Sequence, residues 1–163
     1  MEEYRILTKE EYYSNLDYYQ TKLEQILQTG FSGIDLDNFF HIYPIHTIAL
    51  LIKDNAIVSL IIAYPDAVFD TGSSNILSMD TSFWRIEYIL THSDYRREGY
   101  AKKLLLFTLK DMVLKGANKF DGFYNGLSTP LIKQIAEEYG LDEEIFGRNI
   151  TLLDIDKVLN KKL

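Results

Sequence analysis

The sequence predicts a single mixed α/β domain, in the sense of the α+β class, over residues 1–163. Three observations support this prediction. The length suits one domain, the 47% hydrophobic content suffices for a core, and strand-like apolar runs are interspersed with amphipathic helical segments. The predicted element order is β-α-(α)-β-β-β-α-β-α-β, with no repeat or linker.

The N-terminal segment contains a strand and a helix. Glu3–Leu7 favours a short strand, and Thr8 is placed to cap a helix that continues to about Gln28. Gly30 is expected to end this helix. The following segment, Phe31–Pro44, is mixed, with one short helix expected over Asp35–Phe40.

The central segment is rich in strand-forming residues. His46–Lys53 and Ala56–Tyr64 flank Asp54-Asn55, which predicts a tight hairpin with at least one strand covered on both faces. Pro65–Ser82 is polar and predicts either a long loop or a second, imperfect hairpin. Phe83–Thr91 is rich in aromatic and β-branched residues and predicts a further strand.

The C-terminal part continues the alternation. An amphipathic helix is expected from Ala101 to Lys115, then a strand over Asn118–Tyr124. A second helix is expected from Pro130, with Thr129 as its N-cap, to Tyr139. Glu144–Ile155 predicts strand structure around a turn at 147–149.

The composition excludes several classes of function. A net charge of -7 disfavours a nucleic-acid partner, and the absence of cysteine excludes thiolate chemistry and disulfides. The three histidines are not spaced as ligands, so no metal site is expected. With neither an apolar signal core nor a membrane-spanning segment, we expect a cytoplasmic protein with no membrane partner.

The segment between the strand at 83–91 and the following helix favours an anion. Arg96, Gly99 and Ala101 are spaced R-x-x-G-x-A, and four cationic side chains occur within eight residues: Arg96, Arg97, Lys102 and Lys103. A helix N-terminus exposes unpaired amides with partial positive charge, and glycine permits close approach of a ligand. A pyrophosphate is therefore the expected guest. The alternative is a simple tight turn with solvated cations.

This segment, in its context THSDYRREGYAKKLL, resembles motif A of the GNAT N-acetyltransferase superfamily. The resemblance implies a mostly antiparallel, twisted sheet flanked by helices, with acetyl-CoA as cosubstrate and no metal. The residues it assigns to coenzyme A comprise the strand end, the motif and an asparagine after the next strand: Ile89, Leu90, Thr91, Arg96, Arg97, Glu98, Gly99, Tyr100, Ala101, Lys102 and Asn125. Asn125 beside Gly126 could equally be a turn residue.

The resemblance also implies a base and an acid. Glu87, nine residues before Arg96, stands where the family often has a catalytic glutamate. Its apolar neighbours would desolvate a carboxylate; the alternative is a solvent-facing or ion-paired side chain. The tyrosine that the family often uses as general acid is replaced by Ala136, and Tyr139, about one helical turn on, could substitute or simply pack.

The acceptor is not specified by the sequence. The resemblance implies a primary amine, carried by a small molecule or a peptide, in a cleft formed by 31–44, 65–82 and 144–151. Asp35, Asp37, Glu143 and Glu144 could attract it or be ordinary surface charge. A homodimer remains open. The missing tyrosine also leaves a catalytically weak or inactive coenzyme A-binding, regulatory module as the alternative function.

Overall fold

The computed structural model describes residues 1–27, 35–73, 75–123, 129–147 and 149–159. Within these residues, seven strands form one sheet in the order β1-β2-β3-β4-β5-β7-β6, in which only β4 and β5 pair in parallel. The strands are β1 (Glu2–Ile6), β2 (Thr47–Lys53), β3 (Ala56–Phe69), β4 (Ile76–Thr91), β5 (Lys119–Phe123), β6 (Glu143–Phe146) and β7 (Asn149–Leu152). The mostly antiparallel sheet confirms the predicted fold class.

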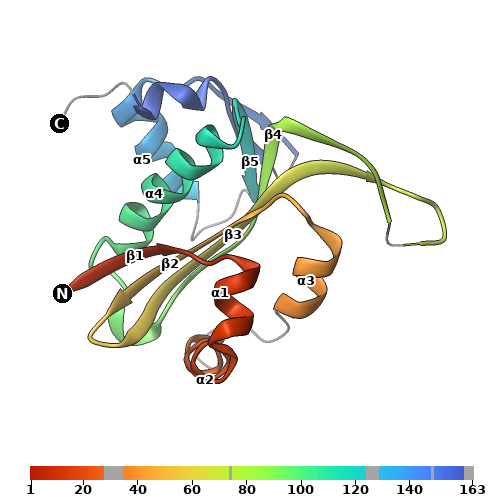
Figure 1. Cartoon of the computed structure of the whole chain (residues 1–163). Helices are drawn as coiled ribbons and strands as arrows, with labels where there is room; N and C mark the ends of the chain where they lie inside the picture. The colour runs from red at the N-terminus through yellow and green to blue at the C-terminus, as the bar shows by residue number, and fades with distance from the viewer. Residues whose placement is uncertain (28–34, 74, 124–128, 148, 160–163) are drawn as a thin grey trace.

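Helices cover both faces of this sheet (Figure 1). One face carries α1 (Lys9–Ser14), α2 (Leu16–Leu27) and α3 (Leu36–Ile42), and the other carries α4 (Tyr100–Leu114) and α5 (Thr129–Tyr139), with 3₁₀ turns at Ser93–Tyr95 and Ile155–Leu159. None of the helices in the described part of the chain is long and apolar enough to cross a lipid bilayer.

Strands β2 and β3 are apolar along most of their length because each faces two hydrophobic cores. Successive side chains of a strand point to opposite faces. Leu51 and Ile61 thus join the core beneath α4 and α5, whereas Leu50 and Leu60 join the core beneath α1–α3. This arrangement confirms the predicted hairpin with buried faces. Its turn residues, Asp54 and Asn55, both have positive φ, 51° and 65°.

The prediction of one helix from Thr8 to Gln28 is wrong, because the helix breaks at Asn15. Thr8 caps α1 as expected, its hydroxyl accepting from the Glu11 amide at 3.1 Å. Asn15 then leaves helical geometry, at φ −132° and ψ 45°.

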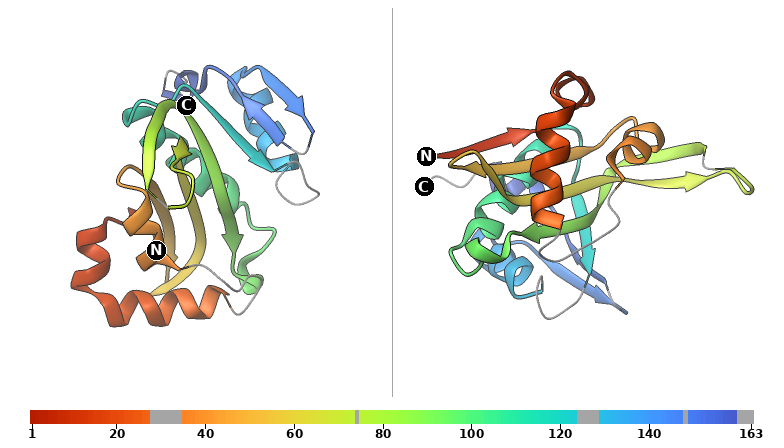
Figure 2. Two further views of the ribbon diagram at one scale, coloured as in Figure 1. Left: turned by 90° about the vertical axis from the view of Figure 1, so that its right-hand side faces the viewer. Right: turned by 90° about the horizontal axis from the view of Figure 1, so that it is seen from below.

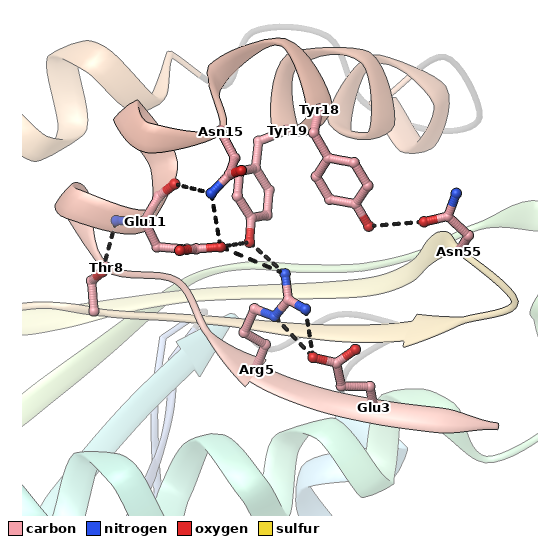
Figure 3. A network of polar contacts seen from close by, with 8 residues as sticks. All are labelled: Glu3, Arg5, Thr8, Glu11, Asn15, Tyr18, Tyr19 and Asn55. Atoms are coloured by element: carbon pink, nitrogen blue, oxygen red, sulfur yellow. Dashed lines mark hydrogen bonds and ion pairs between the residues drawn. The ribbon is translucent and has the colours of Figure 1, made fainter.

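A polar network holds both short helices against β1 (Figure 3). The Arg5 guanidinium donates to the hydroxyl of Tyr19 at 2.6 Å, and this hydroxyl donates to Glu11 at 3.0 Å. Glu11 also accepts from the Asn15 side chain at 3.2 Å. Since Tyr19 is fully buried, these contacts satisfy a polar group that would otherwise be costly to bury.

Residues 65–82 form the second, imperfect hairpin rather than a long loop. The β3–β4 ribbon extends beyond the body of the molecule (Figures 1 and 2). Its register jumps between Pro65 and Asp66, which pair with Trp84 and Asp80, so three residues of β4 have no partner in β3. Residues 66–69 and 76–82 are exposed or half-buried, so this ribbon has no buried face that would give the sequence an alternating pattern.

Most of the remaining elements agree with the predictions, with two differences near the C-terminus. Helix α4 and strand β5 begin within one residue of their expected starts, and α3 is capped by Asp35, which accepts from the Asn38 amide at 3.0 Å. Thr129 is the first residue of α5 rather than its cap. The predicted final strand consists of two, β6 and β7, around Gly147 at φ 60°.

Candidate functional site

Strands β4 and β5 separate partway along their length, and the candidate site lies at this separation. Their ladder covers only Phe83–Arg85 against Lys119–Asp121 in the described chain, although β4 continues to Thr91. Figure 2 shows the two strands diverging beyond this point. The stretch Ile89–Thr91 pairs with β3 on its other side. One edge of this stretch is therefore available for an extended ligand.

A β-bulge places Glu87 at the point of separation. Ile62 pairs with Tyr88 and Ala63 pairs with Ile86, so Glu87 is the extra residue in β4. The Tyr64 hydroxyl donates to Glu87 Oε2 at 2.5 Å. Burial, followed by the hydrogen bond with Glu87, raises the pKa of Tyr64, which keeps the phenol protonated as a donor.

Two small cavities meet at Glu87 and Tyr64. One, of about 170 Å³, lies between α3 and strands β3 and β4. The other, of about 120 Å³, lies where β4 leaves β5 and includes Ile86, Asp121 and Asn149 in its lining. Glu87 and Tyr64 are thus the two described residues that line both cavities.

An ionic cluster joins three strands at the same place. Arg85 Nε donates to Asp66 at 2.8 Å and its Nη1 donates to Asp121 at 3.1 Å. Asp121 is only 6% exposed, and burial raises its pKa although the Arg85 charge opposes the shift. The cluster fixes β3, β4 and β5 to one another just before β4 and β5 part.

The motif turn has the geometry of an anion-binding helix start. Gly99 precedes α4 with φ 78° and no side-chain cap, and a Cβ built on it would have nothing within 4 Å. Arg97 also has positive φ, 67°. Arg96, Arg97 and Glu98 are exposed. The turn is therefore open to solvent at the N-terminus of α4, where the helix amides and the helix dipole favour an anion.

The side chains that follow this turn either anchor α4 or form ion pairs. Tyr100 is 5% exposed, and its hydroxyl accepts from Lys53 at 2.6 Å, so it anchors α4 to β2. Lys102 pairs with Glu138 at 2.7 Å and Lys103 with Glu2 at 3.5 Å. These pairs reduce the positive charge that the two lysines contribute to the surroundings of the turn. Ala101 is half-buried at the start of the helix.

The remaining predicted residues are not brought to Glu87. Tyr139, in the last turn of α5, is half-buried and packs against the core beneath α4 and α5. It is not among the described residues that line either cavity beside Glu87. Ala136 is buried in the same core. Asn125 lies outside the described residues, and no group of three or more metal-ligating side chains occurs within them.

Neither Tyr64 nor the aromatic residues in and just after α3 were predicted as site residues from the sequence. Phe39, Tyr43 and Tyr64 are in mutual ring contact, with the Tyr43 and Tyr64 rings stacked at 4.2 Å. A cluster of aromatic residues after position 38 was visible in the sequence. Its approach to Glu87 was not, since that depends on the bulge and on the packing of α3.

The comparisons with known proteins identify the family. The fold, with a turn and a helix following the central strand β4, is that of the GNAT acetyltransferases. The family model of the acetyltransferase (GNAT) family matches residues 4–123, and the chain belongs to this family. Comparison with curated protein sequences gives no significant match.

Solved structures agree at the level of the fold. The Escherichia coli ribosomal-protein-S18-alanine N-acetyltransferase superimposes with a TM-score of 0.57 at 13% identity, covering 93% of this chain and 90% of that one. A Brucella melitensis GNAT acetyltransferase in complex with acetyl-CoA gives 0.59 at 11% identity, with coverages of 94% and 88%. An aminoglycoside acetyltransferase from an uncultured soil metagenomic sample, in complex with sisomicin, gives 0.57 at 13% identity, with coverages of 90% and 93%.

Proposed function

We propose that this protein is an N-acetyltransferase that transfers the acetyl group of acetyl-CoA to a primary amine by direct attack. The single observation that carries the proposal is the position of Glu87. It is the extra residue of the β4 bulge, and it lines both the cavity at the β4–β5 separation and the cavity beneath α3. A base in this position can reach an amine held on one side and an acyl group held on the other.

Acetyl-CoA, when bound, supplies the activated acetyl thioester. Main-chain amides of residues 97–102 are the proposed diphosphate contacts, with Arg96 adding charge, and the open space over Gly99 supports this assignment. The edge of β4 at Ile89–Thr91 is proposed to align the extended arm of the cosubstrate.

Glu87 is the proposed base. Attack on a thioester requires a neutral amine, so a proton must leave the nitrogen as the N–C bond forms and the C–S bond breaks. The Tyr64 hydroxyl occupies Oε2, and Oε1 makes no hydrogen bond within the described chain. Oε1 can therefore accept this proton, while Tyr64 acts as a positioning residue for the carboxylate. The role of Tyr139 as proton donor to the thiolate remains a prediction. The position of Tyr139, outside the described lining of both cavities, does not support this role.

The test compares Glu87→Gln with wild type on a panel of primary amines. We expect kcat/KM to fall about 10²- to 10⁴-fold, with unchanged affinity for acetyl-CoA, since general-base catalysis contributes this range. Glu137→Gln, which alters an exposed carboxylate on α5, is the matched control. Full activity in Glu87→Gln would remove Glu87 from the mechanism.

The second candidate is a coenzyme A-binding module without turnover. It is favoured by one observation: Ala136, where the resemblance expects a tyrosine, is buried and supplies no proton donor. Tight binding of acetyl-CoA by the wild-type chain, with no coenzyme A released on any amine of the panel, would select this candidate.

A further inference from the structure

The cavity of about 170 Å³ beneath α3 has a chemical character of its own. Six of its nine described lining residues are aromatic or aliphatic (Phe39, Ile42, Tyr43, Ile62, Tyr64 and Tyr88), and Asn38 adds a polar amide. Two carboxylates, Asp35 and Glu87, also line it, and no lysine or arginine is among its described lining residues. Apolar walls combined with acidic groups suit a cation carried on an apolar body.

Three of the aromatic residues that line this cavity also contact one another. Phe39 lies 5.0 Å from Tyr43 and 6.0 Å from Tyr64, measured between ring centroids. Aromatic faces attract an organic ammonium group through the ring quadrupole, with aliphatic or aromatic stems packing beside it.

The volume of the cavity sets the size of the group that it can hold. An apolar protein cavity of about 150 Å³ accommodates a benzene molecule. The cavity beneath α3 is of this order and opens to solvent, so it holds a stem about the size of one phenyl ring while the rest of a longer acceptor can extend outside it.

The two carboxylates of the cavity also restrict which amines can bind. Asp35 is exposed at the start of α3 and Glu87 is half-buried on β4. An amine that carries its own carboxylate, such as a free amino acid, would bring a third negative charge to these two. A simple amine, or the N-terminal amine of a peptide whose next group is a neutral amide, would not.

We infer that this cavity is the acceptor site and selects a primary amine on an apolar stem of about phenyl size without an adjacent carboxylate. This inference rests on the proposed acetyltransferase function and names its substrate class. The ammonium group is held near Glu87, and the stem packs on Phe39, Tyr43 and Tyr88.

Binding is measured by isothermal titration calorimetry on the full chain saturated with coenzyme A, so that the result does not depend on turnover. The probes are 2-phenylethylamine, phenylalanine amide, phenylalanine, 2-aminoethanol and the tripeptide Phe-Ala-Ala amide. We expect 2-phenylethylamine to bind at least about 10-fold more tightly than 2-aminoethanol, and phenylalanine amide to exceed phenylalanine by a similar factor. Comparison of the tripeptide amide with phenylalanine amide distinguishes a peptide N-terminus from a small free amine as the acceptor.

A variant links this selectivity to the cavity. Tyr43→Leu keeps an apolar side chain but removes one ring, and is expected to raise the dissociation constant of 2-phenylethylamine about 2- to 30-fold without changing that of coenzyme A. Tyr18→Leu, on α2, is the matched control because Tyr18 is also half-buried but lines a different cavity.

Equal binding of 2-aminoethanol and 2-phenylethylamine, equal binding of phenylalanine and its amide, or an unchanged Tyr43→Leu would each overturn the inference. Selective binding without acetyl transfer would refute the proposed function and leave the cavity's preference standing. Efficient acetylation of polar amines alone would support the proposed function and refute the preference inferred for the cavity.

Discussion

The turn at Gly99 allows backbone strain and ligand binding to be separated. Gly99 has φ 78°, a conformation that other residues adopt at a cost of about 1–2 kcal/mol. Gly140, after α5, has φ 65°, and a Cβ added at either glycine meets nothing within 4 Å. Gly99→Ala and Gly140→Ala should therefore lower the free energy of unfolding by similar amounts, shifting Tm by about 2–8 °C for a chain of this length.

Only Gly99→Ala should affect coenzyme A. The added methyl group enters the open space over the turn, where we place the diphosphate, and prevents close approach to at least one amide. Losing one hydrogen bond to a charged group costs about 1.5–3 kcal/mol, or roughly a 10- to 150-fold rise in the dissociation constant. Differential scanning fluorimetry gives Tm, and calorimetric titration with coenzyme A gives the affinity. If both variants bind coenzyme A as wild type does, the turn does not bind the diphosphate.

Two further predictions concern stability. Arg5→Ala removes the donor to the buried Tyr19 hydroxyl and should lower the free energy of unfolding in urea by about 1–2 kcal/mol, whereas Lys103→Ala, which breaks an exposed pair, should change it by less than about 0.5 kcal/mol. Equal losses would contradict a structural role for the Arg5 network. Burial lowers the pKa of His46 from its ordinary 6.5, so the folded state binds this proton less readily than the unfolded state and stability is lost as pH falls below about 6.5. His46→Gln should therefore lose less stability than wild type between pH 7 and pH 5, measured by urea unfolding; parallel pH profiles would contradict this.

Much of the fold was predictable because local signals and burial agreed. Asp54-Asn55 between two apolar runs specified a hairpin, and Asp35 specified the start of α3. The break at Asn15 was not predictable from periodicity, since the apolar pattern continues across it. The break is stabilised by contacts among Arg5, Glu11 and Tyr19, which come from separate elements.

The candidate site also has one part that the sequence predicted and one part that it did not. The motif turn at 96–101 is local in sequence, so its glycine, its cations and the helix after it could be recognised directly. The surroundings of Glu87 are not local. Tyr64 lies 23 residues away along the chain, and Asp121 reaches the site through β5. Tyr139 illustrates the limit, because it packs against the same core as Ala136 and neither is among the described residues that line the cavities beside Glu87.

The bulge at Glu87 explains why this position is free for chemistry. In a regular strand, residues two apart face the same side. Trp84 and Ile86 pack into the core beneath α4 and α5, but Tyr88 and Leu90 pack against the core beneath α1–α3. One extra residue is required to change sides, and that residue is Glu87. Neither core needs its side chain, so an acidic residue there does not disturb the packing. The same irregularity that lets β4 serve two cores thus turns a carboxylate toward the space where β4 and β5 part.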